Sequence, residues 1–123
     1  MSERPTWSEY FSDVARLIAK RSTCKRAQVG CVIVVDNQIV STGYNGSLRG
    51  HPHCSAIGCD MDNGHCVRTV HAELNALLQL VAAGGMGLRG RKAEAYVTKM
   101  PCHNCNKALV QAGVELITVV SDK

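Results

Sequence analysis

The chain has 123 residues, of which 46% are hydrophobic and 20% charged, and its net charge is +4. This length and composition predict one globular domain over residues 1–123 and exclude a disordered chain. No apolar run approaches the roughly 18 residues of a membrane span, and no Lys/Arg cluster supports nucleic-acid binding. The polar start of the chain lacks the apolar core of a signal peptide, so we expect a cytoplasmic protein that binds neither membrane nor nucleic acid.

The hydrophobic pattern predicts elements in the order αββαβαβ. Apolar residues at three-and-four spacing, behind a capping box of Thr6 and Glu9, predict a helix that ends near Arg21. The following elements are strands at 29–35 and 39–44, a helix at 71–83, a strand at 94–99, a helix from Pro101 to Gly113 and a strand at 114–120. Strands joined through helices require parallel crossovers. The predicted fold is therefore α/β, a three-layer αβα sandwich with a mixed sheet.

The segment between the second strand and the second helix shows no hydrophobic period from Asn45 to Arg68. Gly, Asn, Asp, His and Cys dominate this Cys/His-rich loop at about 45–70. A loop of that length needs something to hold it. Seven cysteines in a reducing compartment indicate metal ligands and a core thiol rather than disulfides. Cys31, inside a continuous β-branched strand, is best interpreted as that small buried hydrophobe.

Two helix starts carry residues with metal-binding chemistry. His71 opens the second helix, and Cys102 and Cys105 open the third; ligands in layered sheets bind where strands end and helices begin. Two cysteinates and one histidine supply three ligands of a tetrahedral zinc and leave the fourth position for water. Glu73 would accept the proton of that water and pass it on. The alternative, a closed structural zinc with His103 as fourth ligand, leaves Glu73 without a task.

The pair "HAE" and "PCHNC" is similar to the H-x-E and P-C-x-x-C signature of zinc-dependent nucleobase deaminases. With "CKRAQVGCVIV", "STGYNG", "GHCVRTVHAELNALL" and "PCHNCNKALVQAGV", the chain resembles the deoxycytidylate (dCMP) deaminase family over about residues 24–120. The resemblance implies a fold of the cytidine deaminase type and hydrolysis of dCMP to dUMP and ammonia, with Glu73 protonating N3 and then the departing amine. Deamination of another cytosine nucleotide or nucleoside, such as dCTP or cytidine, and a zinc-stabilised binding protein without turnover stay open.

The resemblance also implies substrate contacts. Asn45 of "GYNG" matches the asparagine that holds the sugar, Ala72 would offer its backbone N–H to the pyrimidine carbonyl, and Arg26 would contact the 5′-phosphate. A turn role for Asn45 and a solvated charge for Arg26 are the structural alternatives. Tyr96 on the third strand could line the pyrimidine slot, although a strand tyrosine is more often core.

A second, structural metal is a further implication, because members of the family carry one. The cysteines that remain beside the long loop form its predicted ligand set, in which a histidine could replace one member: Cys24, Cys54, Cys59 and Cys66. The family further implies a homo-oligomer, expected to be a hexamer, with dCTP and dTTP as effectors and Mg²⁺ accompanying an effector nucleotide. The segment from "GYNG" to "SLRG" is the candidate effector site.

The chain departs from the family pattern at two places. Met100 precedes Pro101 where the family more often has a serine or an acid, so a polar contact at the pocket floor is not expected from this position. The chain also stops at Lys123, whereas the family usually adds another strand and helix. A sheet that ends there has an open edge, which oligomerisation could cover.

Overall fold

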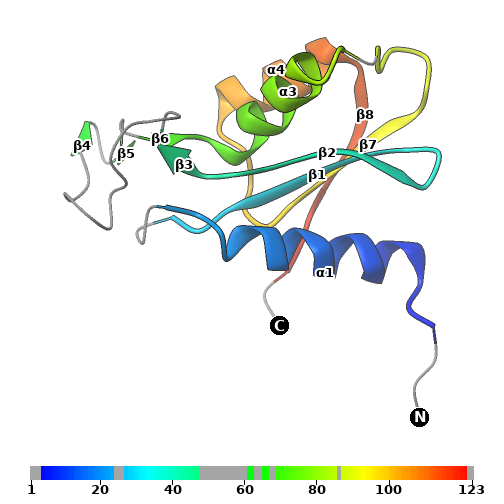
Figure 1. The fold of residues 1–123 in the computed structure, drawn as a ribbon, viewed down its shortest axis with the longest axis horizontal. Helices are drawn as coiled ribbons and strands as arrows, with labels where there is room; N and C mark the ends of the chain where they lie inside the picture. Colours follow the sequence, from blue (N-terminus) through cyan, green and yellow to red (C-terminus); the bar gives the residue numbers. More distant parts are fainter. Residues whose placement is uncertain are drawn as a thin grey trace.

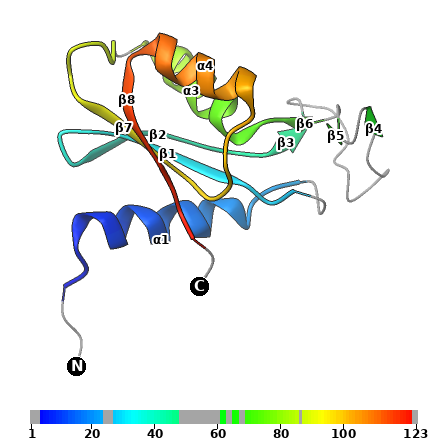
Figure 2. The same cartoon turned by 180° about the vertical axis from the view of Figure 1, so that it is seen from behind.

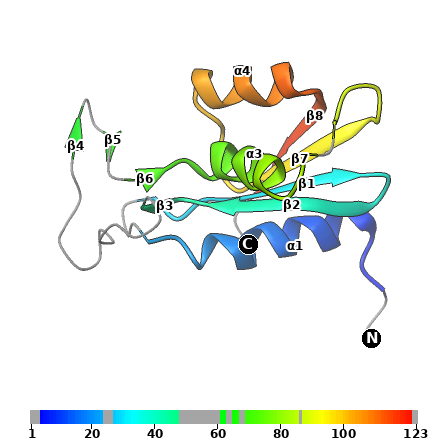
Figure 3. The same ribbon diagram turned by 45° about the horizontal axis from the view of Figure 1, so that its top comes forward.

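The structure is a computed structural model that describes residues 4–23, 27–47, 61–62, 65–66, 69–85 and 87–121. Its main sheet has the spatial order β2-β1-β7-β8, with the strands β1 (Gly30–Val35), β2 (Gln38–Tyr44), β7 (Ala93–Val97) and β8 (Val114–Val119). One face of this sheet is covered by α1 (Trp7–Ala19), the other by α3 (Ala72–Ala82) and α4 (His103–Ala112) (Figure 1, Figure 3). The predicted α/β fold with three layers is confirmed.

The directions of the strands bring two helix starts to one edge of the sheet. β1 and β2 form an antiparallel hairpin whose turn residues, Asp36 and Asn37, have φ values of 53° and 60°. Both values are left-handed, as a two-residue type I′ turn requires. β1 also pairs antiparallel with β7, and β7 pairs parallel with β8. β2 and β7 therefore run in the same direction on either side of β1, and the chain leaves both at the same edge before entering α3 and α4.

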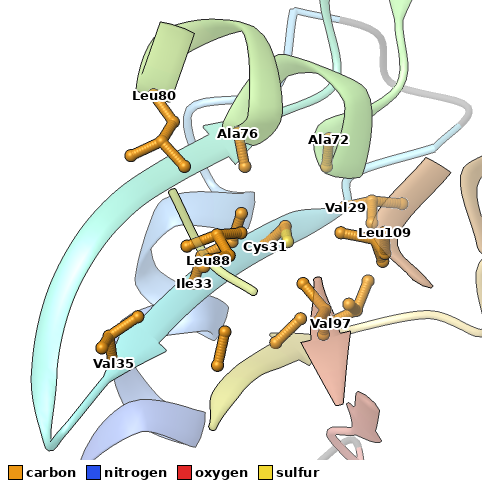
Figure 4. Packing of buried hydrophobic residues seen from close by; sticks show 13 residues of the cluster. Val29, Cys31, Ile33, Val35, Ala72, Ala76, Leu80, Leu88, Val97 and Leu109 are labelled. Atoms are coloured by element: carbon orange, nitrogen blue, oxygen red, sulfur yellow. The ribbon is translucent and has the colours of Figure 1, made fainter. Parts of the chain in front are cut away.

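The core is divided by the sheet into two clusters. β1 is buried along its whole length, and its alternate residues serve different faces. Cys31 and Ile33 lie in the cluster under α3 and α4, with Ala72 and Ala76 of α3 above them (Figure 4). The second cluster lies under α1 and contains Phe11. Each helical layer thus has its own apolar contact with the central strand.

The end of β8 and the start of α1 are held by specific hydrogen bonds. Arg16 donates from Nε and Nη2 to the carbonyl oxygen of Ser121, at 3.1 and 2.9 Å, where the chain leaves β8 and reaches α1 (Figure 2). The predicted capping box is present, since Oγ1 of Thr6 accepts the N–H of Glu9 at 3.1 Å and the Glu9 carboxylate accepts the N–H of Thr6 at 2.8 Å. Within the described ranges, no helix is long and apolar enough to cross a membrane.

Two predicted boundaries differ from the structure. The third strand ends at Val97 rather than Lys99, because Thr98 instead fixes the start of β1: its N–H donates to the carbonyl of Gly30 at 3.1 Å, and its Oγ1 accepts the Gly30 N–H at 3.0 Å. The predicted loop also contains short paired segments, which a hydrophobic period cannot indicate over so few residues. These are β3 (Gly46–Ser47) with β6 (Thr69–Val70), and β4 (Met61–Asp62) with β5 (His65–Cys66).

Candidate metal centre

Three predicted ligands meet where α3 and α4 begin. His71 is the N-cap residue of α3 and Cys102 is the N-cap residue of α4, one turn before Cys105. Nδ1 of His71 lies 3.3 Å from Sγ of Cys105 and 3.7 Å from Sγ of Cys102. All three ligand atoms lie within 4.8 Å of one another. The sequence places Cys102 and Cys105 31 and 34 residues from His71, so the fold makes this cluster.

The donor set and its spacing fit zinc. A tetrahedral zinc with Zn–S near 2.3 Å and Zn–N near 2.0 Å has an N···S edge of about 3.5 Å. The two observed N···S distances, 3.3 and 3.7 Å, lie on either side of this value. His71 and Cys102 are half-buried and Cys105 is buried. Three protein ligands at a half-open position are typical of a catalytic rather than a closed structural zinc.

His103 does not join this group. The closed-site alternative requires it as a fourth ligand, but His103 is exposed on the first turn of α4. Among the residues that the structure describes, the ligand atoms that converge are those of His71, Cys102 and Cys105. The placement of His103 therefore disfavours the closed structural zinc site considered from the sequence.

The first amides of α3 connect the parts of the site. Helix N-termini leave several N–H groups without intrahelical acceptors. In α3 the N–H of Ala72 donates to Oδ1 of Asn45 at 2.8 Å. The N–H of Glu73 acts on its own carboxyl, and that of Leu74 on the Cys105 thiol, each in the direction that lowers the pKa of that side chain. Asn45, which precedes β3, and Cys105 of α4 thus both lie next to the first turn of α3.

Glu73 lies at the same helix start with its side chain only 4% exposed. Burial raises the pKa of its carboxyl, while its own backbone N–H, His71 and the Lys99 side chain act in the opposite direction. A buried carboxyl with a raised pKa, held beside a metal-ligand set, has the environment of a group that accepts and returns protons. The role of Glu73 in proton transfer stays a prediction, and its burial at this helix start is consistent with it.

The two thiols around this carboxyl have different surroundings. Burial raises the pKa of Cys105, with further increases from Glu73 and Cys102, while the Leu74 N–H lowers it. A bound cation would be needed to hold this sulfur as a thiolate. Cys31 is fully buried on β1, and burial followed by the charges of Glu73 and Cys105 raises its pKa. Its thiol is a neutral part of the core beneath the site.

Two predicted substrate contacts lie together, but they bind each other. Oδ1 of Asn45 accepts the Ala72 N–H, and Nδ2 of Asn45 donates to the carbonyl oxygen of Ala27 at 3.0 Å. In this structure the Ala72 N–H donates to Asn45, and its donation to a pyrimidine carbonyl stays a prediction. The contact of Asn45 with a sugar also stays a prediction, since its amide oxygen has a second lone pair and its Nδ2 a second hydrogen.

Tyr96 lies away from the cluster. It packs against Phe11 of α1, with ring centroids 5.4 Å apart, and belongs to the core cluster on the α1 face. Side chains alternate along a strand, so Ala95 and Val97 face α3 and α4 while Tyr96 faces α1. The predicted pocket-lining role does not fit this placement, and the core interpretation does.

Several predicted residues lie outside the described part of the chain. Arg26, Cys24, Cys54 and Cys59 are among them. Cys66 is described as part of the backbone of β5. The second metal group and the phosphate contact therefore stay predictions.

Sequence reasoning missed three residues that hold α3. Ser41 donates from Oγ to the carbonyl oxygen of Ala76 at 2.6 Å, and Nδ2 of Asn75 donates to the carbonyl oxygen of Tyr44 at 2.8 Å. Gly43 of β2 packs directly against α3, so that a Cβ at this position would overlap the backbone of α3. For Ser41 and Gly43 the available signal was two small residues at alternate positions of β2.

The comparisons with known proteins agree with this site. A family model described as the cytidine and deoxycytidylate deaminase zinc-binding region matches residues 5–121. The deoxycytidylate deaminase of Mycobacterium phage D29 is 37% identical over 126 residues, which cover 93% of this chain and 94% of that protein. The chain belongs to the cytidine and deoxycytidylate deaminase family. Its matched region contains His71, Glu73, Cys102 and Cys105, and a zinc-binding description fits their donor chemistry.

Other family members differ in length. ComE operon protein 2 of Bacillus subtilis is 44% identical over 120 residues, which cover 98% of this chain. The chain spans 62% of the length of that protein and 36% of each of two yeast deoxycytidylate deaminases. The dCMP deaminase of cyanophage S-TIM5, solved in complex with dCMP and dUMP, matches with a TM-score of 0.77 at 31% identity, over 94% of this chain and 82% of that one. The shared deaminase fold therefore extends over nearly the whole chain.

Proposed function

We propose that the protein catalyses the hydrolytic deamination of dCMP to dUMP and ammonia. The observation that carries the proposal is the convergence of His71, Cys102 and Cys105 beside the buried carboxyl of Glu73. A purely structural zinc site has no use for an acid at a half-open ligand set. The phage relative named deoxycytidylate deaminase, and the phage structure that holds dCMP and dUMP, support this substrate class.

The residues of the site have separate tasks in this reaction. His71, Cys102 and Cys105 would hold zinc, which when bound supplies Lewis-acid activation of water. Glu73 accepts one proton from the attacking water and delivers it to N3 of the pyrimidine. The water oxygen forms a bond to C4, Glu73 passes the second proton to the amino group, and the C4–N bond breaks. Ammonia leaves and the C4 carbonyl of uracil remains.

Substrate choice and the second metal are also part of the proposal. Arg26 would contact the 5′-phosphate, which would separate dCMP from deoxycytidine. A second zinc would be held by Cys24, Cys54, Cys59 and Cys66, in keeping with the resemblance to dCMP deaminases. The same resemblance supports a homo-oligomer, expected to be a hexamer, that responds to dCTP and dTTP, with Mg²⁺ accompanying the effector. Zinc counting per chain and sedimentation with and without each nucleotide would test these expectations.

The test of the reaction is ammonia release from dCMP, dCTP, deoxycytidine and CMP, measured for the wild type and Glu73→Gln at matched zinc content. Glutamine keeps the size of the side chain but cannot transfer the protons. We expect the wild type to turn over dCMP, and Glu73→Gln to lose at least about 10²–10⁴-fold in kcat while retaining zinc.

Two results would contradict this proposal. Absence of turnover on all four compounds by the zinc-loaded wild type, with dCTP also tested as an effector, would exclude the deaminase function for this chain. Equal turnover of dCMP and deoxycytidine would show a nucleoside-type deaminase instead. The corresponding zinc analysis of Glu73→Gln distinguishes loss of chemistry from loss of metal.

A further inference from the structure

The N-terminus of α3 lacks the cap that its own first residue would ordinarily supply. The N-cap position is His71, and its side chain makes no capping hydrogen bond. Its Nδ1 instead faces the sulfur atoms of Cys102 and Cys105. A side chain committed to a metal cannot also accept a helix amide through the same atom. Helix N-terminal amides lack intrahelical acceptors, so the first amide of α3 needs an acceptor from elsewhere in the chain.

Asn45 supplies that acceptor from outside the helix. Its Oδ1 lies 2.8 Å from the N of Ala72, the first residue of α3, although the two residues are 27 positions apart in the sequence. Asparagine is among the best side chains for accepting helix N-terminal amides. An N-cap side chain would accept the second or third helical amide, so Asn45 provides an additional acceptor, for the first amide of α3, while His71 has the N-cap backbone position.

The Asn45 side chain is held in one orientation. Nδ2 donates to Ala27 O at 3.0 Å, the backbone N–H donates to Val29 O at 3.2 Å, and the carbonyl accepts the Thr23 N–H at 2.9 Å. Exchanging the amide oxygen and nitrogen would put N–H groups against the Ala72 N–H and an oxygen against the Ala27 carbonyl. At 6% exposure, such unmade hydrogen bonds would be costly. The acceptor for α3 is therefore a fixed group.

We propose that Asn45 is a positioning residue that caps α3 from outside the helix and thereby sets where His71 and Glu73 lie relative to Cys102 and Cys105. The proposal rests on the metal site of the proposed function. His71 precedes the capped amide and Glu73 follows it, so movement of this turn displaces a metal ligand and the proton-transferring carboxyl together. A role in sugar binding alone would predict no effect on the metal centre.

The experiment uses the full-length chain loaded with Co²⁺, whose thiolate charge-transfer and d–d bands report on the geometry of the ligand set. Asn45→Ala is expected to bind Co²⁺ about tenfold more weakly, the range for loss of an outer-shell partner, and to shift the d–d bands. Its kcat for dCMP should fall more than its KM rises. Asn45→Asp retains an acceptor for the Ala72 N–H but loses the donor to Ala27 O, so it should recover only part of the Co²⁺ affinity that Asn45→Ala loses.

Thr6→Ala is the matched control, because it removes an N-cap hydrogen bond from α1 on the opposite face of the sheet. It should leave the Co²⁺ bands and affinity unchanged. The proposal is overturned if Thr6→Ala changes the metal centre as much as Asn45→Ala does. It is also overturned if Asn45→Ala keeps wild-type bands and affinity and only raises KM, which would indicate a substrate contact.

The remaining outcomes separate the cap from the reaction. A wild type that shows thiolate bands with Co²⁺ but does not deaminate dCMP contradicts the proposed function, and the variants can still be compared through their spectra. A wild type without such bands overturns both proposals. If Asn45→Ala does not fold, amide hydrogen exchange in the metal-free wild type decides the question. Slow exchange at Ala72 is expected, and exchange as fast as at an exposed amide would overturn the cap.

Discussion

The two helices that carry the metal ligands begin at the same edge of the sheet but are capped in different ways. In α4 the ligand Cys102 is also the N-cap, and its Sγ accepts the Cys105 N–H at 3.4 Å. In α3 the ligand His71 occupies the N-cap position without capping, and Asn45 accepts the N–H of the first helical residue, Ala72. The start of α4 is therefore complete within one short motif, whereas the start of α3 depends on tertiary structure.

This difference explains why the two halves of the deaminase signature depend unequally on the rest of the chain. The P-C-x-x-C half contains a ligand, a cap and a second ligand within one helical turn. The H-x-E half contains a ligand and an acid, but its position is fixed by hydrogen bonds from the hairpin and the segment that follows it. Changes at the hairpin position that contacts the first turn of α3 should therefore affect the α3 half of the site, and changes in α1 should not.

Cys102→Ser should give the largest effect, because it separates the two functions of Cys102. Serine is a good N-cap but a poor zinc ligand, so the metal-free variant should be at least as stable as the metal-free wild type. Its zinc affinity should fall by more than about a hundredfold, since loss of an outer-shell partner alone costs about 10–100-fold. Chelator competition measures the affinity, and urea unfolding with and without zinc measures the stability.

Cys31→Ala is the control for that experiment. Its thiol lies in the core close enough to Glu73 and Cys105 to be affected by their charges, but it is not one of the converging ligands. This variant should lose stability and keep its zinc affinity. Comparable loss of zinc by both variants would contradict the assignment of Cys102 as a ligand.

Gly43→Ala and Gly30→Ala should have an intermediate effect and test the hairpin directly. A Cβ at Gly43 would overlap Ala72 O and Ala76 N of α3, and one at Gly30 would overlap the backbone of α1 at Ala15. Both variants should lose about 1–3 kcal/mol of stability through overpacking. Only Gly43→Ala moves the turn that holds His71, so it alone should lose zinc affinity, by about tenfold. An equal loss of zinc affinity in both variants would show that general destabilisation, and not the contact of Gly43 with α3, controls the metal site.

Much of the fold could be predicted because its signals are local. The period of α1 and its Thr6–Glu9 box, the Asp36–Asn37 turn and the glycine that ends α4 each lie within a few residues. The face to which a strand residue points was not predictable in the same way. Alternation along β7 separates Tyr96 from its neighbours, but only the packed helices show which side faces the metal ligands.

The residues of the candidate site also differ in how local their sequence signals are. The ligands and Glu73 were predicted from two short motifs, since metal and acid–base chemistry restrict the residue types. The pairing of Asn45 with Ala72 could not be predicted, because an asparagine beside a glycine is equally typical of a turn. Its function as a cap depends on a contact between residues 27 positions apart.

Ser41→Ala should give the smallest effect and show how far along α3 the contacts with the hairpin affect zinc binding. Ser41 donates to Ala76 O at 2.6 Å, one turn beyond the amide that Asn45 accepts. The Ala76 carbonyl oxygen is also in position to accept the N–H four residues later in α3, so it stays hydrogen-bonded when the hydroxyl is lost. We expect a loss of about 1 kcal/mol in urea unfolding, typical of one buried hydrogen bond, and an unchanged zinc affinity. If Ser41→Ala instead weakens zinc as much as Gly43→Ala does, the whole first half of α3, and not its capped first turn, determines the position of His71.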